Sequence, residues 1–197
     1  MTTSSADPHL RAQKLGLYGL LSDWSAVADQ PWIEELLQRE EAGRKQRSLE
    51  RRLHNSRLGR FKFMADFDLA WPTKIDREQI DDLFTLTWID AASNVILVGP
   101  NGVGKTMIAQ NLVHQAVVRG ATARFVTASE LLNDLAAQEG AAALQRRLRR
   151  YCSPQLLAID ELGYLSYDHR HADLLFEVVT RRYGARSTLI TTNKPFA

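Results

Sequence analysis

The stretch that decides the fold is Gly99-Pro100-Asn101-Gly102-Val103-Gly104-Lys105-Thr106, which matches the phosphate-binding pattern G-x-x-x-x-G-K-S/T. Residues 94–98 predict a short buried strand entering this loop, and the chain from Met107 onward predicts a helix leaving it. Glycines let backbone N–H groups turn inward around phosphate oxygens, and the helix N-terminus adds a positive dipole end. We therefore expect residues 99–107 to bind a nucleotide, with Lys105 at its β- and γ-phosphates and the Thr106 hydroxyl on Mg²⁺. The alternative is a glycine-rich surface turn.

Two acidic residues follow another predicted strand, at residues 156–159. Parallel strands end at one edge of a sheet, so Asp160 and Glu161 are expected beside the phosphate loop. Asp160 would hold Mg²⁺ through water, and Glu161 would orient or deprotonate an attacking water. The alternative is a carboxylate pair that caps the next turn. An adjacent acid favours hydrolysis over transfer of phosphate to a second substrate, so a phosphate-loop kinase is a remote alternative.

A polar run, Thr191-Thr192-Asn193, ends a fourth predicted strand at residues 188–191. The amide of Asn193 would reach the γ-phosphate and the attacking water from the side, although a plain turn residue is the alternative reading. The expected catalytic residues are therefore Lys105, Glu161 and Asn193, and the expected metal ligands are Thr106 and Asp160.

Strands and helices alternate after residue 94. A strand is predicted at 123–126, and a capping box at Thr127 to Glu130 opens the helix that follows it. Two further helices are predicted, one at 141–151 and one that is capped by Asp168 and stops at Gly184. The last helix should bury a face made of Ala172, Leu175, Phe176, Val179 and Tyr183. This alternation predicts an α/β fold with three layers around a parallel sheet.

The residues before this fold predict helices. One amphipathic helix is expected from Pro8 to about Val27, and a second from Pro31 to Gly59. Residues 60–75 predict a packed connecting segment anchored by aromatic residues, including Phe67 and Trp71, and helical spacing returns at 75–91. We expect a small α-helical N-terminal domain at residues 1–59, for partner or DNA binding, and a nucleotide-binding core at 60–197.

Composition is that of a globular protein, with 197 residues of which 45% are hydrophobic. Cys152 is the single cysteine and gives no internal disulfide. The first residues lack the pattern of a signal peptide, and no segment has the length of a membrane span. A cytoplasmic location without membrane contact is expected.

Positive charge is concentrated, although the net charge is only +2. Residues 44–62 hold eight Lys or Arg and one acidic residue, Glu50, and a second basic run follows residue 145. Such runs are either solvated helix faces or surfaces that contact nucleic-acid phosphates with little sequence preference and strong salt dependence. The candidate DNA-binding residues are Arg44, Lys45, Arg47, Arg51, Arg52, Arg146, Arg147, Arg149 and Arg150.

Several runs resemble one known family. The runs are 160–165 (Asp-Glu-Leu-Gly-Tyr-Leu), 171–176 (His-Ala-Asp-Leu-Leu-Phe), 181–183 (Arg-Arg-Tyr) and 187–193 (Ser-Thr-Leu-Ile-Thr-Thr-Asn). With the phosphate loop they resemble the IstB family of AAA+ ATPases, transposition helpers of insertion sequences that are similar to DnaC-type helicase loaders. The resemblance implies a P-loop NTPase (AAA+) core with Walker A at 99–106, Walker B at 156–161 and sensor 1 at Asn193. It also implies binding and hydrolysis of ATP with Mg²⁺, homo-oligomeric assembly on DNA, and delivery of that complex to the transposase of the same element.

The end of the sequence departs from this family, whose members continue through a helix, a fifth strand, an arginine finger and a helical lid. A sequence that ends at Ala197 is expected to leave one edge of the first strand unpaired and to lack the finger, since Arg181 and Arg182 lie elsewhere. This departure makes a nucleotide-binding scaffold with little turnover one alternative function. A second alternative, which shares all of these motifs, is a helicase loader whose partner is the replicative helicase.

Overall fold

The computed structural model describes residues 7–68, 75–164 and 169–194. The chain divides into two compact units, Met1–Glu50 and Arg51–Ala197. They meet inside the long helix α4 (Trp32–Ser56), whereas the sequence placed the boundary after residue 59. The end of α4 belongs to the second unit because Nε of Arg52 donates to the carbonyl of Val117 and the Ser56 side chain is buried there. The expected roles of Trp71 and Asp168 lie outside the described residues.

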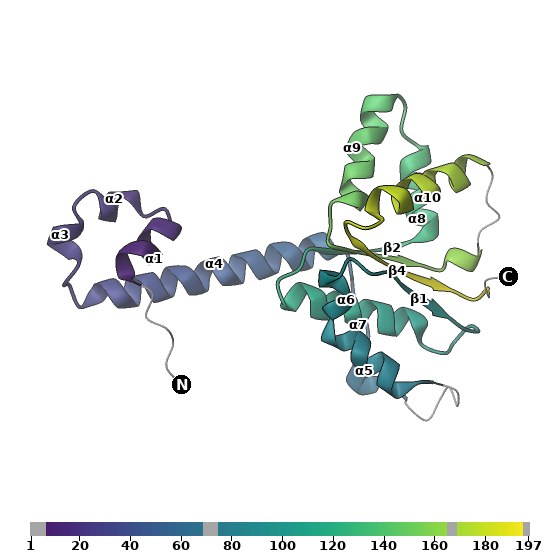
Figure 1. The fold of residues 1–197 in the computed structure, drawn as a ribbon, viewed down its shortest axis with the longest axis horizontal. Coiled ribbons are helices and arrows are strands. Elements are labelled where there is room, and N and C mark those ends of the chain that lie inside the picture. Colours follow the sequence, from purple (N-terminus) through teal and green to yellow (C-terminus); the bar gives the residue numbers. More distant parts are fainter. Residues whose placement is uncertain (1–6, 69–74, 165–168, 195–197) are drawn as a thin grey trace. The chain divides into compact units, whose positions relative to one another are not determined.

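The second unit contains the predicted parallel sheet (Figure 1). Its strands are β1 (Val95–Val98), β2 (Ala123–Thr127), β3 (Leu156–Asp160) and β4 (Ser187–Thr192), in the order β1-β4-β3-β2. In register, Ile159 lies beside Ile190, and Val98 beside Thr192. The carboxyl ends of all four strands therefore reach the same edge, where the nucleotide site was expected.

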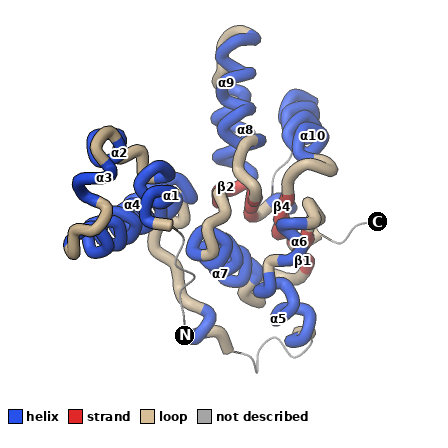
Figure 2. Tube along the Cα trace, turned by 60° about the vertical axis from the view of Figure 1, so that its left-hand side comes forward, coloured by secondary structure: helices blue, strands red, loops and turns tan. Residues whose placement is uncertain are grey.

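Helices cover both faces of the sheet and complete the predicted three layers (Figures 1 and 2). Helix α7 (Lys105–Val118) lies on one face, with α5 (Arg77–Thr85) and α6 (Thr87–Asp90) on its side of the sheet. Helices α8 (Ala128–Ala136), α9 (Ala141–Cys152) and α10 (His169–Arg182) lie on the other. Apolar side chains between these layers, such as Leu112 and Leu131, are fully buried, and each contributes about 1.5–3 kcal/mol of transfer free energy. Short 3₁₀ helices span Met64–Asp66 (η1) and Leu162–Tyr164 (η2).

Local signals explain where these helices begin and end. The predicted capping box is confirmed: Glu130 N–H donates to Thr127 Oγ1 and Thr127 N–H to Glu130 Oε2, each at 3.2 Å. The helical region predicted at 75–91 is instead two helices, because Leu86 takes a left-handed backbone with φ of 64°.

Among the helices of the described ranges, none combines the length and the apolar character that a membrane span requires.

The first strand is less buried than expected. Ile96 and Val98 are 45% and 49% exposed, whereas Val95 and Leu97 are partly buried. The reason is position, because β1 forms one edge of the described sheet and the helices pack mainly on β2, β3 and β4. The expectation of a buried strand is therefore wrong for Ile96 and Val98, and β1 is an edge strand of the described sheet.

The buried face of α10 also differs from the prediction. Leu174, Val178 and Arg182 are buried, whereas Phe176 and Tyr183 are exposed. Arg182 dictates this orientation because it donates six hydrogen bonds, to Thr188 Oγ1 and to the carbonyl oxygens of Tyr151, Cys152, Pro154, Gln155 and Ser187. Burial lowers the pKa of Arg182 to about 10. This arginine joins the end of α9 to the beginnings of β3 and β4.

The N-terminal unit has three short helices, α1 (Pro8–Lys14), α2 (Tyr18–Leu21) and α3 (Trp24–Val27), before α4. The prediction of one helix from residue 8 to 27 is wrong because Gly16 turns the chain with a left-handed φ of 61°. A small apolar cluster, which includes Ala12, Ile33 and Leu37, holds α1 against the start of α4.

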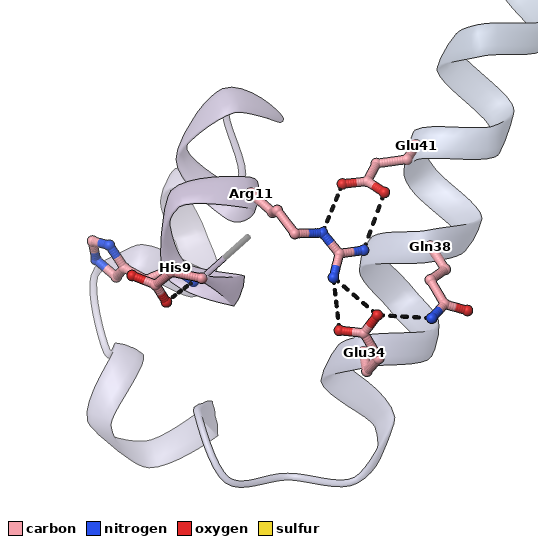
Figure 3. Close-up of polar contacts among 6 residues, drawn as sticks. His9, Arg11, Glu34, Gln38 and Glu41 are labelled. Atoms are coloured by element: carbon pink, nitrogen blue, oxygen red, sulfur yellow. Dashed lines mark hydrogen bonds and ion pairs between the residues drawn. The ribbon is translucent and has the colours of Figure 1, made fainter. Parts of the chain in front are cut away.

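Arg11 ties the N-terminal unit together (Figure 3). Its Nε and Nη2 donate to the two carboxylate oxygens of Glu41 at 2.8 and 3.0 Å, and its Nη1 contacts both oxygens of Glu34 at 2.9 and 2.7 Å. These hydrogen bonds lower the pKa of both carboxyl groups. One α1 side chain thereby contacts two α4 residues that lie about two helical turns apart.

The six hydrogen bonds of Arg182 predict a large loss of stability in Arg182→Met. Methionine fills a similar space but leaves five carbonyl oxygens without this donor, so we expect the free energy of unfolding to fall by about 3 kcal/mol or more. Urea unfolding measures it, with Arg181→Met as the control. Arg181 makes an i,i+4 ion pair with Glu177 at the surface, and its loss should cost about 0.5 kcal/mol. Equal losses in the two variants would show that the buried network does not stabilise the fold.

The lowered pKa values of Glu34 and Glu41 predict acid sensitivity of the N-terminal unit. A carboxyl whose folded pKa is depressed contributes stability above its unfolded pKa and loses it as the pH falls through the folded pKa. Thermal unfolding followed by the indole NMR signals of Trp24 and Trp32 should show a melting temperature that falls from pH 6 to pH 3. In Arg11→Met the drop should be smaller; identical pH dependence would contradict the role of Arg11.

Candidate nucleotide site

A pocket of about 360 Å³ lies at the carboxyl ends of the strands. Eight of the predicted site residues line it: Asn101, Gly102, Gly104, Lys105, Thr106, Met107, Glu161 and Asn193. Four further residues line it as well: Lys62, Gln110, Thr191 and Thr192. Four predicted residues do not line it: Gly99, Pro100, Val103 and Asp160. The carbonyl groups of Gly99 and Pro100 accept hydrogen bonds from Lys105, and Asp160 accepts one from Thr106. The fold thus brings the three separate motifs of the sequence to one cavity.

The phosphate loop depends on glycine at two positions. Gly102 and Gly104 have φ of 79° and 92°, in the left-handed region that glycine adopts without strain. A Cβ on Gly104 would also lie 2.4 Å from the ring of Phe67. The connecting segment therefore packs its aromatic anchor directly against the loop.

Lys105 begins α7 and folds back over the loop. Its Nζ donates to the carbonyl oxygens of Gly99 at 2.6 Å and Pro100 at 2.7 Å. Burial lowers the pKa of Lys105, and the charge of Asp160 opposes this shift. The ammonium group is therefore held at the loop, near the carboxylate of β3.

Asp160 is the buried centre of the site. Thr106 Oγ1 donates to its Oδ1 at 3.1 Å, and Thr191 Oγ1 donates to the same oxygen. Only 3% of Asp160 is exposed. Hydroxyl and carboxylate oxygens are the ligands that Mg²⁺ prefers, and Thr106 and Asp160 are already adjacent, so these residues fit the ion expected with a nucleotide.

Glu161 does not share the buried position of Asp160, because its backbone has a left-handed conformation. Its φ is 61°, which for a residue with a Cβ costs about 1 kcal/mol or more, and its N–H donates to Thr191 Oγ1 at 2.9 Å. The chain turns immediately after Asp160. Two successive acidic residues consequently have different surroundings, with Asp160 buried between hydroxyl groups and Glu161 exposed at the pocket.

Asn193 lines the pocket with an amide that is not fully hydrogen-bonded. Its Oδ1 is buried and has no hydrogen-bond partner among the described residues. Gly163 makes this position possible, since a Cβ there would lie 2.1 Å from Asn193 Oδ1 and 2.8 Å from Thr192 Oγ1. A buried acceptor without a partner, at the wall of a pocket, is a feature expected of a ligand site.

Sequence reasoning missed Lys62, which it had counted only as part of a basic run. Asn111, buried on α7, donates from Nδ2 to the carbonyl of Lys62 at 2.8 Å and accepts from the N–H of Met64 at 3.0 Å. This pair of hydrogen bonds fixes the connecting segment at the place where Lys62 lines the pocket. The available signal was Asn111 itself, a polar residue among the apolar residues of that helix.

The candidate DNA-binding arginines fall into different environments. In the N-terminal unit, Arg44 and Arg47 both pair with Glu40, and Lys45 is exposed. On α9, Arg147 contacts Asp134 at 3.4 Å, whereas the others are exposed: Arg146, Arg149 and Arg150. Arg51 is exposed and Arg52 is partly buried at the end of α4.

The parallel sheet, its helices and the phosphate loop define a P-loop fold of the AAA+ type. AMPPCP-bound DnaA from Aquifex aeolicus superposes with a TM-score of 0.59 at 18% identity, covering 70% of this chain and 43% of DnaA. The DnaC helicase loader gives 0.53 at 20% identity, covering 73% of this chain and 79% of DnaC. Identities this low show a shared fold and nothing about partners.

The chain belongs to the family of IstB-like ATP binding proteins, whose family model matches residues 14–197. One relative is an ATP-binding protein, so named, from insertion sequence IS5376 of Geobacillus stearothermophilus. The two sequences are 32% identical over 95% of this chain and 78% of that protein. A counterpart named in the same way, from insertion sequence IS21 of Pseudomonas aeruginosa, is 37% identical over 82% of this chain and 61% of its own length.

The close approach of Gly163 to Asn193 predicts coupled effects on stability. Gly163→Ala should lower the free energy of unfolding by about 1–3 kcal/mol, because the new methyl group overlaps the amide. Asn193→Ala removes the closest overlapping atom and leaves only the 2.8 Å approach to Thr192 Oγ1, so the double variant should be no less stable than Gly163→Ala alone. A double-mutant cycle by urea unfolding measures this coupling. Additive losses would show that the two residues do not constrain each other.

Proposed function

We propose that this protein hydrolyses ATP with Mg²⁺ and assembles on DNA to assist transposition. The observation that carries the hydrolytic part is the separation of two adjacent carboxylates, with Asp160 buried beside Thr106 and Glu161 at the pocket. A phosphate-loop protein that binds without reacting has no need of a second, solvent-facing acid. Membership of an ATP-binding family supports ATP as the nucleotide.

The residues of the site divide the chemical work. Lys105 and the loop N–H groups orient the phosphates, and Glu161 orients an attacking water or accepts its proton. The Asn193 amide fixes the position of that water relative to the γ-phosphate. Thr106 and Asp160 would hold Mg²⁺, which when bound neutralises charge on the phosphate oxygens. The buried hydroxyl contacts of Asp160 keep this carboxylate in place during turnover.

The DNA part rests on the basic runs and on the origin of the relatives. Arg51, Arg146, Arg149 and the other exposed candidates would contact phosphates, giving weak sequence preference. Relatives encoded in insertion sequences support a transposase of the same element as the partner. Homo-oligomeric assembly is part of the same proposal. Co-purification with a replicative helicase in place of the transposase would favour the helicase-loader alternative.

Glu161→Gln tests the hydrolytic proposal. The glutamine keeps size and polarity but cannot accept a proton, so we expect phosphate release to fall by about 100-fold or more while ATP binding changes little. Release of inorganic phosphate, with and without DNA, and titration of a fluorescent ATP analogue are the two measurements. Glu139→Gln, at an exposed position before α9, is the control. A wild-type chain that binds ATP without releasing phosphate in either condition would favour the scaffold alternative.

A further inference from the structure

A second pocket, of about 350 Å³, lies in the core unit at the start of β2, away from the carboxyl ends of the strands. Four arginines from different parts of the chain line it: Arg52, Arg57, Arg124 and Arg150. The other described lining residues are polar or small and uncharged, and none of them is acidic. The fold therefore gathers four guanidinium groups around one cavity.

Arg124, on β2, has the most unusual environment of the four. Its guanidinium carbon lies 5.0 Å from the centroid of the Tyr151 ring, and its Nε is buried without a hydrogen-bond partner among the described residues. Burial lowers the pKa of Arg124, and the charges of Arg150 and Arg57 lower it further. A buried donor without a partner, beside like charges, costs free energy that an anion in the pocket would recover.

The acidic residues closest to these arginines, Glu130 and Asp134, line an adjoining cavity and not this pocket. Within the described ranges, Arg57, Arg124 and Arg150 make no ion pair, and the nearby Arg147 is the one that contacts Asp134. Free carbonyl groups at the C-terminus of a helix would repel an anion. At the end of α9, Arg182 donates hydrogen bonds to the carbonyl oxygens of Tyr151, Cys152 and Pro154. The pocket is therefore an electropositive cavity in which at least one hydrogen-bond donor, Nε of Arg124, has no partner among the described residues.

We propose that this pocket binds a phosphate of a nucleic-acid backbone, with Arg57 and Arg124 as residues that contact it. The cavity joins the two basic runs, because Arg52 comes from the first and Arg150 from the second. Guanidinium groups suit phosphate oxygens because they donate two parallel hydrogen bonds. The inference rests on the proposed assembly on DNA and names the contact that serves it.

A backbone phosphate fits better than a free phosphate ion because the charge extends beyond the cavity. Arg51 and Arg149, next to Arg52 and Arg150 in the sequence, are exposed, as is Arg60. A lone ion would use only the pocket, whereas a polyanion also contacts flanking positive charges. The site is separate from the nucleotide pocket, with which it shares no lining residue.

The test is DNA binding by the full chain, using fluorescence anisotropy with a labelled duplex of mixed sequence at several salt concentrations. Arg124→Gln and Arg57→Asn each remove one charge from the pocket. The second variant protects the fold, because Arg57 has φ of 59°, and asparagine tolerates that backbone better than most residues. Arg39→Gln is the matched control: Arg39 is exposed, lies outside both runs and pairs with Glu35.

We expect each pocket variant to weaken binding about 10-fold at low salt and to reduce the slope of log K against log salt by about 1. Arg39→Gln should change neither. If wild type binds DNA and both pocket variants keep its affinity and slope, the pocket proposal is overturned and the proposed function stands. Wild type that does not bind DNA overturns both. If inorganic phosphate stabilises wild type but not Arg57→Asn, with DNA binding unchanged, the site takes a free ion and the backbone proposal fails.

Discussion

One carboxylate oxygen connects three parts of the nucleotide site. Asp160 Oδ1 accepts hydrogen bonds from Thr106 at the start of α7 and from Thr191 near the end of β4. The parallel register makes this possible, because Ile159 lies beside Ile190 and the next residue of each strand then meets at the edge. Motifs more than 80 residues apart in the chain are thereby held in a fixed relation, and the same carboxylate would hold the metal ion. The remaining geometry of the site, including Glu161 and Asn193, is built around this contact.

Much of the fold and of the site was predictable because the signals are local. The phosphate-loop pattern needs only eight consecutive residues, and the capping box needs four. Alternation of apolar strands with amphipathic helices implies a parallel sheet, and a parallel sheet places Asp160 and Asn193 at the same edge as the loop. Composition and pattern were sufficient for these conclusions, since no long-range contact had to be known.

The wrong predictions have two causes. Some depend on the sign of a backbone φ angle, and others depend on contacts between residues that are far apart in the sequence. Gly16 and Leu86 break expected helices through left-handed φ values, which residue type alone does not reveal for a leucine. The burial of Arg182 was not predicted, because no nearby residue indicates the carbonyl groups that this side chain contacts at and just after the end of α9. The clustering of Arg124 with residues of both basic runs likewise depends on how β2, α4 and α9 pack, so it could only be seen in the structure.

A single amide on α7 has a consequence for the motions of the nucleotide pocket. The Asn111 side chain bonds the carbonyl of Met107 within its own helix as well as the Lys62 carbonyl and the Met64 N–H of the connecting segment. Neither the segment nor this turn of α7 can open locally without breaking the same group of hydrogen bonds. We therefore expect the segment around Lys62 and this turn of α7 to open as one cooperative unit in native-state hydrogen exchange.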